Sequence, residues 1–354
     1  GIVGLPGCGK TTVFRALTGG TGGGEPRGHL TAGLGVVKVE DDRLDYLAAT
    51  YKAKKVTPVH VEYVDIPGLT GEGQRGKEIG DRILAHLRPV DALIHCVRFF
   101  DSPALGPAEP LKDLQRVEEE MILSDLAAVE KRIDRIDKDV KKGRKELIGE
   151  LELLEQARSF LDNGEPLRFF EDAWESEQLK GFAFLSAKPE LFLLNASENV
   201  SADRVRTVME EIGKLTEGQP YTAVDWIYGD AEAEIARLAP EDAKEFLEEL
   251  DLEEGAQSRI VKRSFGLLKM IVFFTAGEKE VRAWPLRKNE TALAAAGTVH
   301  TDMQRGFIRA EVIPFDEFKE AGSMAEAHKA GNVRLEGKEY VVNDGEIILF
   351  RFNV

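Results

Sequence analysis

The sequence is short of cysteine, of long apolar runs and of positive charge. It has two cysteines in 354 residues, Cys8 and Cys96, which is too few for a disulfide framework or a cysteine-based zinc site. No apolar run approaches the ~20 residues that span a bilayer, and no secretory signal is visible. Basic residues number 47 against 63 acidic ones, a formal net charge of −16. These absences argue against membrane contact, DNA binding and general coating of nucleic acid, and they favour a cytoplasmic protein.

The length and the composition indicate several soluble domains. A chain of 354 residues is too long for one compact core, so two or three domains are expected. Its content of 43% hydrophobic and 31% charged residues is that of a globular protein.

A phosphate-binding motif opens the chain. In GIVGLPGCGKTT, Gly4, Gly9, Lys10 and Thr11 fit G-x-x-x-x-G-K-[ST], with a strand pattern before the motif and a helix pattern after it. Backbone N–H groups and the helix dipole would hold the phosphates. Lys10 would reach the β- and γ-phosphates, and the Thr11 hydroxyl would bind Mg²⁺. The same surroundings would lower the pKa of Cys8, which allows a redox role, although a small residue that fits the loop is the simpler interpretation.

Two later segments have the character of nucleotide-sensing switches. Residues 18–34 are rich in glycine, and Thr31 or Thr21 there would complete the magnesium shell. Asp65 ends an apolar strand and fits D-x-x-G together with Gly68. In a nucleotide switch such an aspartate holds Mg²⁺ through water, and the glycine N–H meets the γ-phosphate.

The residues that would direct water to the phosphate are less clear. Leu69 stands where many such enzymes have a glutamine that orients the attacking water, so hydrolysis needs another group. His95, in the apolar run 91–100, has two interpretations. It is either a core histidine satisfied by a backbone carbonyl, which is the commoner fate, or a residue that faces the nucleotide and positions water.

Residues 105–180 have a helical pattern that predicts an antiparallel coiled-coil hairpin. The segment 131–145 holds eight basic and three acidic residues. It is either a solvated helix face or a contact for RNA phosphate. The apolar residues of the predicted seam are Ile122, Leu126, Val129, Ile133, Ile136, Val140, Leu147, Leu151, Leu154 and Leu161.

The chain then returns to a strand, over 181–198, that ends in Asn195, Ala196 and Glu198. GTP-selective enzymes commonly carry N-K-x-D here, with an aspartate that pairs with guanine. A longer glutamate does not fit the same position, so the residues favour adenine. From residue 269 onward, short β runs (VRAWPL, AAGTVH, GFIRAEVIPF and KEYVVNDGEIILFRFNV) predict a β-grasp-like binding module.

Three sets of residues resemble the Obg-like ATPase family, also called the YchF family. The first is the opening motif with D-I-x-G-L at 65–69, and the second is A-K-P at 187–189 with N-x-x-E at 195–198. The third and most specific set is FFTAGEKEVRAW (273–284), AAGTVHTDMQRGFIRAEV (295–312) and LEGKEYVVNDGEIILFRFNV (335–354).

The resemblance implies a P-loop NTPase (Ras-like) domain at 1–104 and 181–268, an inserted coiled-coil domain at 105–180, and a TGS domain at 269–354. It implies slow, Mg²⁺-dependent ATP hydrolysis and association with ribosomes in the cytoplasm. It places the family's catalytic histidine on His95. The nucleotide contacts that the resemblance carries over are Gly7, Cys8, Gly9, Lys10, Thr11, Thr12 and Ala196, with Thr11 on Mg²⁺. The motif residues above add Asp65, Gly68, Asn195 and Glu198 to the nucleotide site. Thr31, from the glycine-rich segment, is the candidate for a second metal ligand, although the family's threonine falls on position 29.

The chain departs from the family pattern in places, which marks a divergent member. The loop reads G-C-G-K-T rather than N-V-G-K-S, and IYGDAEAE near residue 229 lacks the family's small Ser/Cys-Ala pair. Two alternative functions stay open at this point: a guanine-specific GTPase, and a non-catalytic adaptor gated by nucleotide.

Overall fold

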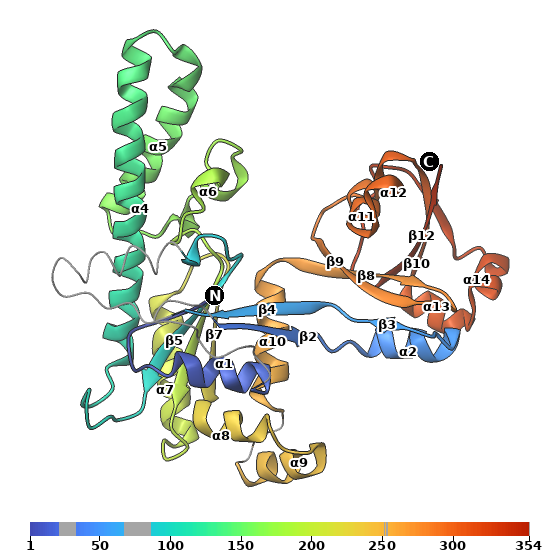
Figure 1. Ribbon diagram of the computed structural model, residues 1–354, viewed down its shortest axis with the longest axis horizontal. Coiled ribbons are helices and arrows are strands. Elements are labelled where there is room, and N and C mark those ends of the chain that lie inside the picture. The colour runs from blue at the N-terminus through green and yellow to red at the C-terminus, as the bar shows by residue number, and fades with distance from the viewer. Residues whose placement is uncertain (21–32, 67–85, 251, 253, 354) are drawn as a thin grey trace. The chain divides into compact units, whose positions relative to one another are not determined.

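A computed structural model describes residues 1–20, 33–66, 86–250, 252 and 254–353 (Figure 1). These residues form two compact units. The first comprises Gly1–Val36 and Glu62–Leu267, and the second comprises Val37–Val61 and Leu268–Val354. No helix within the described ranges has the length and apolar character that crossing a membrane requires.

The first unit is built on a six-stranded sheet with the order β2-β4-β1-β5-β6-β7. Strand β1 pairs in parallel with β4 and β5, and β5, β6 and β7 continue in parallel. Every residue of β5 and β6 is buried, which explains why most of their residues are apolar. Because parallel strands end at one edge, the loops that follow them meet where α/β sheets bind ligands. The strands are β1 (Ile2–Val3), β2 (Gly33–Lys38), β4 (His60–Asp65), β5 (Leu93–Phe99), β6 (Glu190–Ala196) and β7 (Thr222–Tyr228).

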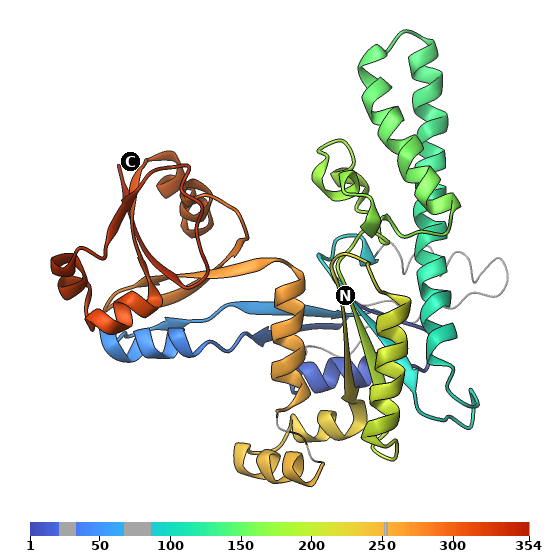
Figure 2. The ribbon, with the colours of Figure 1, turned by 180° about the vertical axis from the view of Figure 1, so that it is seen from behind.

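Helices cover both faces of this sheet. Helices α4 (Pro110–Lys141) and α7 (Ala202–Leu215) pack on one face, where Leu114 and Val205 join Phe99 and Phe192 in an apolar cluster. Figure 2 shows α7 and α10 on opposite sides of the strands. Other helices of the unit are α1 (Lys10–Thr18), α8 (Gly229–Ile235), α9 (Pro240–Glu249) and α10 (Ala256–Leu267).

The predicted helical hairpin is formed by α4 and α5 (Ile148–Asp162), joined through the short 3-10 helix η1 (Lys145–Leu147), and the two helices lie side by side (Figure 1). All ten residues of the predicted seam belong to the apolar cluster between them. Arg132 on α4 also donates two hydrogen bonds to Glu150 on α5, at 2.7 and 2.8 Å. A 3-10 helix η2 (Leu167–Phe169) and helix α6 (Asp172–Glu175) follow the hairpin.

The prediction of a strand over 181–198 is wrong for its first half. A 3-10 helix, η3 (Lys180–Phe182), stands there, and β6 begins only at Glu190. The amides of Leu185 and Ser186 donate to the Asp125 carboxylate on α4, at 3.1 and 2.8 Å. These amides are therefore not free for a strand partner, and Pro189 has no N–H to donate, so the regular ladder of β6 begins after it.

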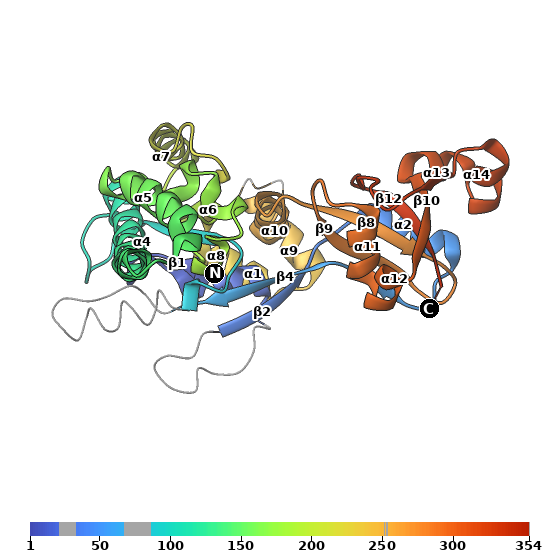
Figure 3. The ribbon, with the colours of Figure 1, turned by 90° about the horizontal axis from the view of Figure 1, so that it is seen from above.

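The second unit has its own six-stranded sheet, with the order β11-β10-β12-β8-β9-β3. Helix α11 (Ala292–Val299) packs on β9 and α13 (Phe315–Ala321) packs on β10 (Figure 3). This mixed α+β module agrees with the predicted β-grasp-like fold. Its other elements are α2 (Asp42–Tyr51), β3 (Val56–Thr57), β8 (Met270–Ala276), β9 (Val281–Arg287), α12 (Thr301–Arg305), β10 (Phe307–Pro314), α14 (Met324–Ala330), β11 (Arg334–Glu336) and β12 (Glu346–Phe352).

The predicted β run at 295–300 is wrong, because most of these residues lie in α11. Alanine has the highest helix propensity, and the Thr291 hydroxyl accepts a hydrogen bond from the Ala294 amide at the start of the helix.

The segment 37–61 groups with the C-terminal residues rather than with the N-terminal P-loop segment to which the sequence analysis assigned it. Strand β3 pairs with β9, with Val56 opposite Val281. The Arg43 guanidinium on α2 contacts the Asp344 carboxylate at 2.6 Å. The predicted boundary at 104 therefore leaves out an excursion of the chain into the second unit.

Candidate nucleotide-binding site

The phosphate loop, residues Gly4–Thr11, lies between β1 and the first turn of α1. Gly4, Gly7 and Gly9 have φ values of +150°, +74° and +93°, which favour glycine. At Gly9 a side chain is also excluded by space, because a Cβ there would lie 2.1 Å from Nδ2 of Asn195. The glycines of the motif therefore meet a conformational and a steric requirement of this loop.

Lys10 reaches back over the loop. Its side chain is 7% exposed, and Nζ donates to the carbonyl oxygens of Gly4 at 3.1 Å and Leu5 at 2.9 Å. Among the described residues no carboxylate forms an ion pair with Lys10. The ammonium is thus held at the loop by exchangeable backbone contacts, where it can neutralise the charge of a phosphate.

Thr11 and Asp65 meet beside the loop, although 54 residues separate them in the sequence. The Thr11 hydroxyl donates to Oδ2 of Asp65 at 2.8 Å. Burial raises the pKa of Asp65, and the hydrogen bond from Thr11 opposes that shift. A hydroxyl and a carboxylate are oxygen ligands of the kind that Mg²⁺ prefers, so these two side chains fit the predicted metal.

Asn195 ties the phosphate loop to the rest of the site. Its Nδ2 donates to the Cys8 carbonyl at 2.9 Å, and its Oδ1 accepts the Gly229 N–H at 3.1 Å. A Cβ at Gly229 would lie 2.4 Å from that oxygen, so the absence of a side chain at this position makes room for the contact. The side chain predicted to contact nucleotide thus fixes the loop and the start of α8.

The other predicted contacts lie at the same edge or outside the described residues. Ala196 is buried at the end of β6, and Glu198 is exposed two residues later. Thr12 is half-buried in the first turn of α1. The described part of the chain does not include Gly68 or Thr31, nor Leu69 and Thr21.

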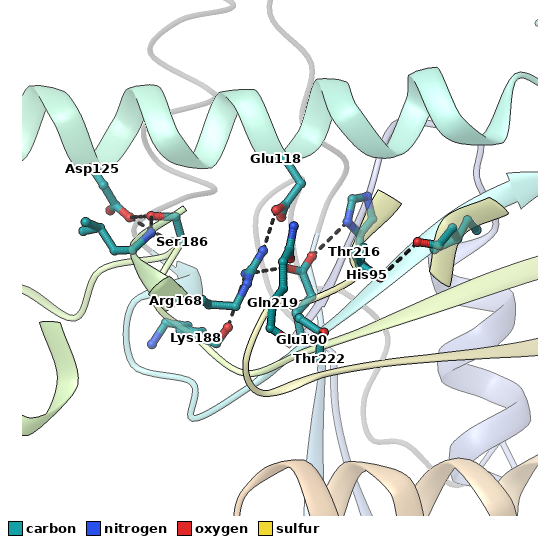
Figure 4. A network of polar contacts seen from close by, with 12 residues as sticks. His95, Glu118, Asp125, Arg168, Ser186, Lys188, Glu190, Thr216, Gln219 and Thr222 are labelled. Carbon is teal, nitrogen blue, oxygen red and sulfur yellow. Dashed lines mark hydrogen bonds and ion pairs between the residues drawn. The ribbon is translucent and has the colours of Figure 1, made fainter. Parts of the chain in front are cut away.

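His95 lies in a buried network that also contains Glu118, Arg168 and Glu190 (Figure 4). Its ring is 1% exposed, and Nδ1 lies 2.9 Å from Oε1 of Glu190. Burial lowers the pKa of His95 to about 4. This geometry favours the core interpretation, with a carboxylate in place of the expected backbone carbonyl. A catalytic role for His95 stays a prediction.

Arg168 holds the centre of the buried network. Its guanidinium donates to Oε2 of Glu190 at 2.5 Å and also to Glu118, which reaches down from α4. His95, Glu118 and Glu190 offer ligand atoms within 4.8 Å of one another, the arrangement of a metal site. The guanidinium already supplies the positive charge between the two carboxylates, so this cluster does not fit a metal ion.

Comparisons with known proteins cover the whole chain. A family model described as 50S ribosome-binding GTPase matches residues 1–133, and YchF-GTPase_C, described as a protein of unknown function, matches residues 270–353. The chain is 39% identical to the ribosome-binding ATPase YchF of Bacillus subtilis, over 100% of this chain and 99% of that protein. The chain belongs to the YchF/Obg-like ATPase family. The human Obg-like ATPase 1 is 35% identical, over 100% of this chain and 92% of that protein.

A solved structure agrees with the YchF assignment. The Schizosaccharomyces pombe YchF GTPase has a TM-score of 0.83 and 28% identity, over 99% of this chain and 96% of that one. The resemblance drawn from the sequence motifs is thereby confirmed, and so is the fold of a P-loop NTPase domain with a C-terminal TGS-like module.

Within this YchF chain, the sequence analysis did not anticipate Glu118, Arg168 or Glu190. Their signal was weak, because each acidic or basic residue stands among many others on a helix or in a loop. The one usable sign was His95 itself, since a histidine inside a buried strand requires a polar partner.

Proposed function

We propose that this chain is a nucleotide-switch ATPase that binds ATP with Mg²⁺, hydrolyses it slowly and acts on the ribosome or the translation machinery in the cytoplasm. The Thr11–Asp65 contact carries the proposal, because it pairs a hydroxyl with a carboxylate beside a phosphate loop. The Bacillus subtilis relative is named a ribosome-binding ATPase and the human relative an Obg-like ATPase, which supports the choice of nucleotide and partner.

The residues of the site have separate roles in this reaction. Backbone amides of the phosphate loop hold the phosphates. Thr11 would hold Mg²⁺ directly and Asp65 through water, and the ion would supply neutralising charge at the phosphates. Lys10 leaves the carbonyls of Gly4 and Leu5 and stabilises charge on the transferred phosphoryl group. A leucine at 69 in place of a water-orienting glutamine accounts for a slow rate.

Measuring phosphate release tests whether the chain hydrolyses ATP. Release is measured with ATP and with GTP, with and without ribosomes. Lys10→Ala is expected to lower the rate by about 10²–10³-fold, the effect of removing one charge-stabilising donor. Lys112→Ala, at an exposed lysine of α4, serves as the matched control. If the unmodified chain releases no phosphate under any of these conditions, it is instead an adaptor whose partner binding depends on ATP but not on turnover.

Calorimetric dissociation constants test the nucleotide preference. Glu198 at the position of the guanine-pairing aspartate supports ATP. A tenfold preference for GTP, ~1.4 kcal/mol, would overturn this choice and favour a guanine-specific GTPase.

The tip of the α4–α5 hairpin is the proposed contact with ribosomal RNA, together with the TGS-like module. Several basic residues of the segment 131–145 form ion pairs within the hairpin, for example Arg144 with Asp139 at 3.4 Å. Lys138 and Lys145 are exposed. Replacing both by alanine is expected to weaken co-sedimentation with ribosomes and to lower its salt dependence, whereas Arg158→Ala on α5 is expected to change neither.

A further inference from the structure

The two cysteines of the chain lie next to each other at the phosphate loop, although 88 residues separate them in the sequence. Cys8 belongs to the loop and is 2% exposed, and Cys96 lies on β5 and is 1% exposed. The Cys96 thiol donates to the backbone carbonyl of Cys8 at 3.2 Å. The two sulfur atoms therefore occupy one small compartment between the loop and the sheet.

The two thiols change each other's acidity. Each thiol has the largest influence on the pKa of the other: the Cys96 thiol, aided by Lys10, lowers the pKa of Cys8 to about 7, and the Cys8 thiol raises the pKa of Cys96. Nζ of Lys10 lies 3.9 Å from Sγ of Cys8 and favours the thiolate there. Cys8 thus has the character of an attacking thiolate beside a thiol that can resolve it.

Gly4 keeps the space around the two cysteines free of a third side chain. A Cβ at Gly4 would lie 2.8 Å from Sγ of Cys8 and 2.5 Å from the carbonyl oxygen of Cys96. The φ value of +150° at Gly4 is also one that other residues rarely adopt. The loop therefore brings Cys8 against the backbone of β5 at Cys96.

We propose that Cys8 and Cys96 form a reversible disulfide, with hydrogen peroxide or another hydroperoxide as the oxidant, and that this bond switches the phosphate loop off. The Cys8 thiolate attacks a peroxide oxygen, the O–O bond breaks, and Cys8 sulfenic acid and water form once the released hydroxide takes a proton. The Cys96 sulfur then attacks the Cys8 sulfur, the S–O bond breaks, and the hydroxyl leaves with the Cys96 proton as water. Hydrogen peroxide is thereby reduced to two waters (an organic hydroperoxide to an alcohol and one water), two thiols are oxidised, and an added dithiol reverses the change.

The bond is expected to disturb the loop because it is short. An S–S bond of about 2.05 Å is shorter than any non-bonded contact between sulfur atoms, so it draws Cys8 toward β5. The Cys8 carbonyl accepts a hydrogen bond from Asn195, so a displaced Cys8 disturbs a contact that fixes the phosphate loop. This step rests on the proposed function. We expect the oxidised chain to bind ATP at least tenfold more weakly, and bound ATP to slow oxidation by the same linkage.

The test treats the full chain with hydrogen peroxide and measures intact mass and free thiols without nucleotide. The expected product is a monomer that has lost two hydrogens and both thiols, and dithiothreitol restores it. With two cysteines in the chain, such a monomer identifies the Cys8–Cys96 bond. Cys96→Ala and, as a second variant, Cys96→Val are expected to keep the ATP affinity of the reduced chain and to gain oxygen at Cys8 instead of a disulfide.

Retention of both thiols, or disulfide-linked dimers in place of the monomer, overturns the proposed bond. An oxidised monomer whose ATP dissociation constant is unchanged overturns the switch. If the reduced chain binds no ATP, the proposed function and the switch both fail, while the mass measurement still decides whether the bond forms.

Discussion

Two polar clusters of the first unit use the same central strands but are satisfied in different ways. At the phosphate loop, Lys10 donates to two backbone carbonyls and has no carboxylate partner among the described residues, and Thr11 is exposed. In the buried network, Arg168 pairs with the carboxylates of Glu118 and Glu190, and the side chains of Arg168 and Glu190 have no access to water. The first cluster has contacts that a ligand can replace, and the second has contacts that only its own members can supply.

The position of a polar residue along its strand decides whether its side chain pairs inside the protein or contacts the ligand-binding loops. Asn195 is the sixth residue of the seven in β6 and reaches the loop, whereas His95 is the third residue of β5 and lies between the sheet and α4. A polar side chain in the middle of a buried strand must find its partner inside the protein. At the carboxyl end it can serve the ligand-binding loops.

The largest effect is expected from breaking the buried network. Arg168→Leu leaves two carboxylates buried without their cation, which typically costs about 3–5 kcal/mol of unfolding free energy. Urea denaturation at neutral pH measures the loss, with Arg158→Leu, at a half-buried arginine of α5, as the matched control. A loss no larger than that of the control would show that Arg168 does not pair with the two buried carboxylates as described.

A smaller effect is expected from loosening the phosphate loop. Asn195→Ala removes two hydrogen bonds and leaves the Cys8 carbonyl and the Gly229 N–H without their partner. At about 1 kcal/mol for each bond, the free energy of unfolding should fall by about 2 kcal/mol, and the ATP dissociation constant should rise. Asn199→Ala, at an exposed asparagine three residues after β6, is the control and should change neither quantity.

Glu118 and His95 of the buried network should have opposite effects on the pH dependence of stability. Burial and the nearby charge of Glu190 raise the pKa of Glu118 to about 7, from a usual 4.5. Within this range the folded state holds a proton that the unfolded state has released, so stability falls as pH rises. Burial lowers the pKa of His95 to about 4, from 6.5, so that the unfolded state holds the extra proton and stability rises with pH.

The two trends oppose each other between about pH 4.5 and 6.5, so the joint contribution of Glu118 and His95 to the unmodified chain should give a shallow profile. Glu118→Gln removes the falling trend. Its unfolding free energy should rise with pH by up to about 1.4 kcal/mol per unit, measured by urea denaturation across this range. Glu119→Gln, on the exposed side of α4, should keep the shallow profile. Equal slopes in the two variants would contradict the assigned pKa of Glu118.

Much of the fold is predictable because its signals are local. The hairpin seam follows a helical period, and all ten of its predicted residues pack together. The membership of residues 37–61 in the second unit is not local, because β3 has only two residues and pairs with a strand more than 200 residues away. The run at 295–300 is too short for its period to separate helix from strand.

In the candidate site, too, residues fixed by local spacing are predictable and contacts fixed by the tertiary fold are not. Gly4, Lys10, Thr11 and Asp65 are predictable from motif spacing, because a phosphate loop imposes both the residue types and their order. The partners of Asn195 are not, since its hydrogen bonds to the Cys8 carbonyl and the Gly229 N–H depend on backbone placement that no motif encodes. The buried network is assembled from four separate segments of the chain and is invisible to any window of sequence.

The smallest effect is expected at His95, where the sequence and the structure point to different roles. The amide of His95→Gln can still donate to Glu190, so the loss of stability should be modest, and phosphate release should change by no more than about twofold. Loss of a general base or acid would instead lower the rate by about 10²–10⁴-fold. Single-turnover phosphate release with saturating ATP distinguishes the two, with Lys10→Ala as the reference for a damaged site. A fall of the larger size with unchanged stability would place His95 in the chemistry, and the ring would then have to leave Glu190 during turnover.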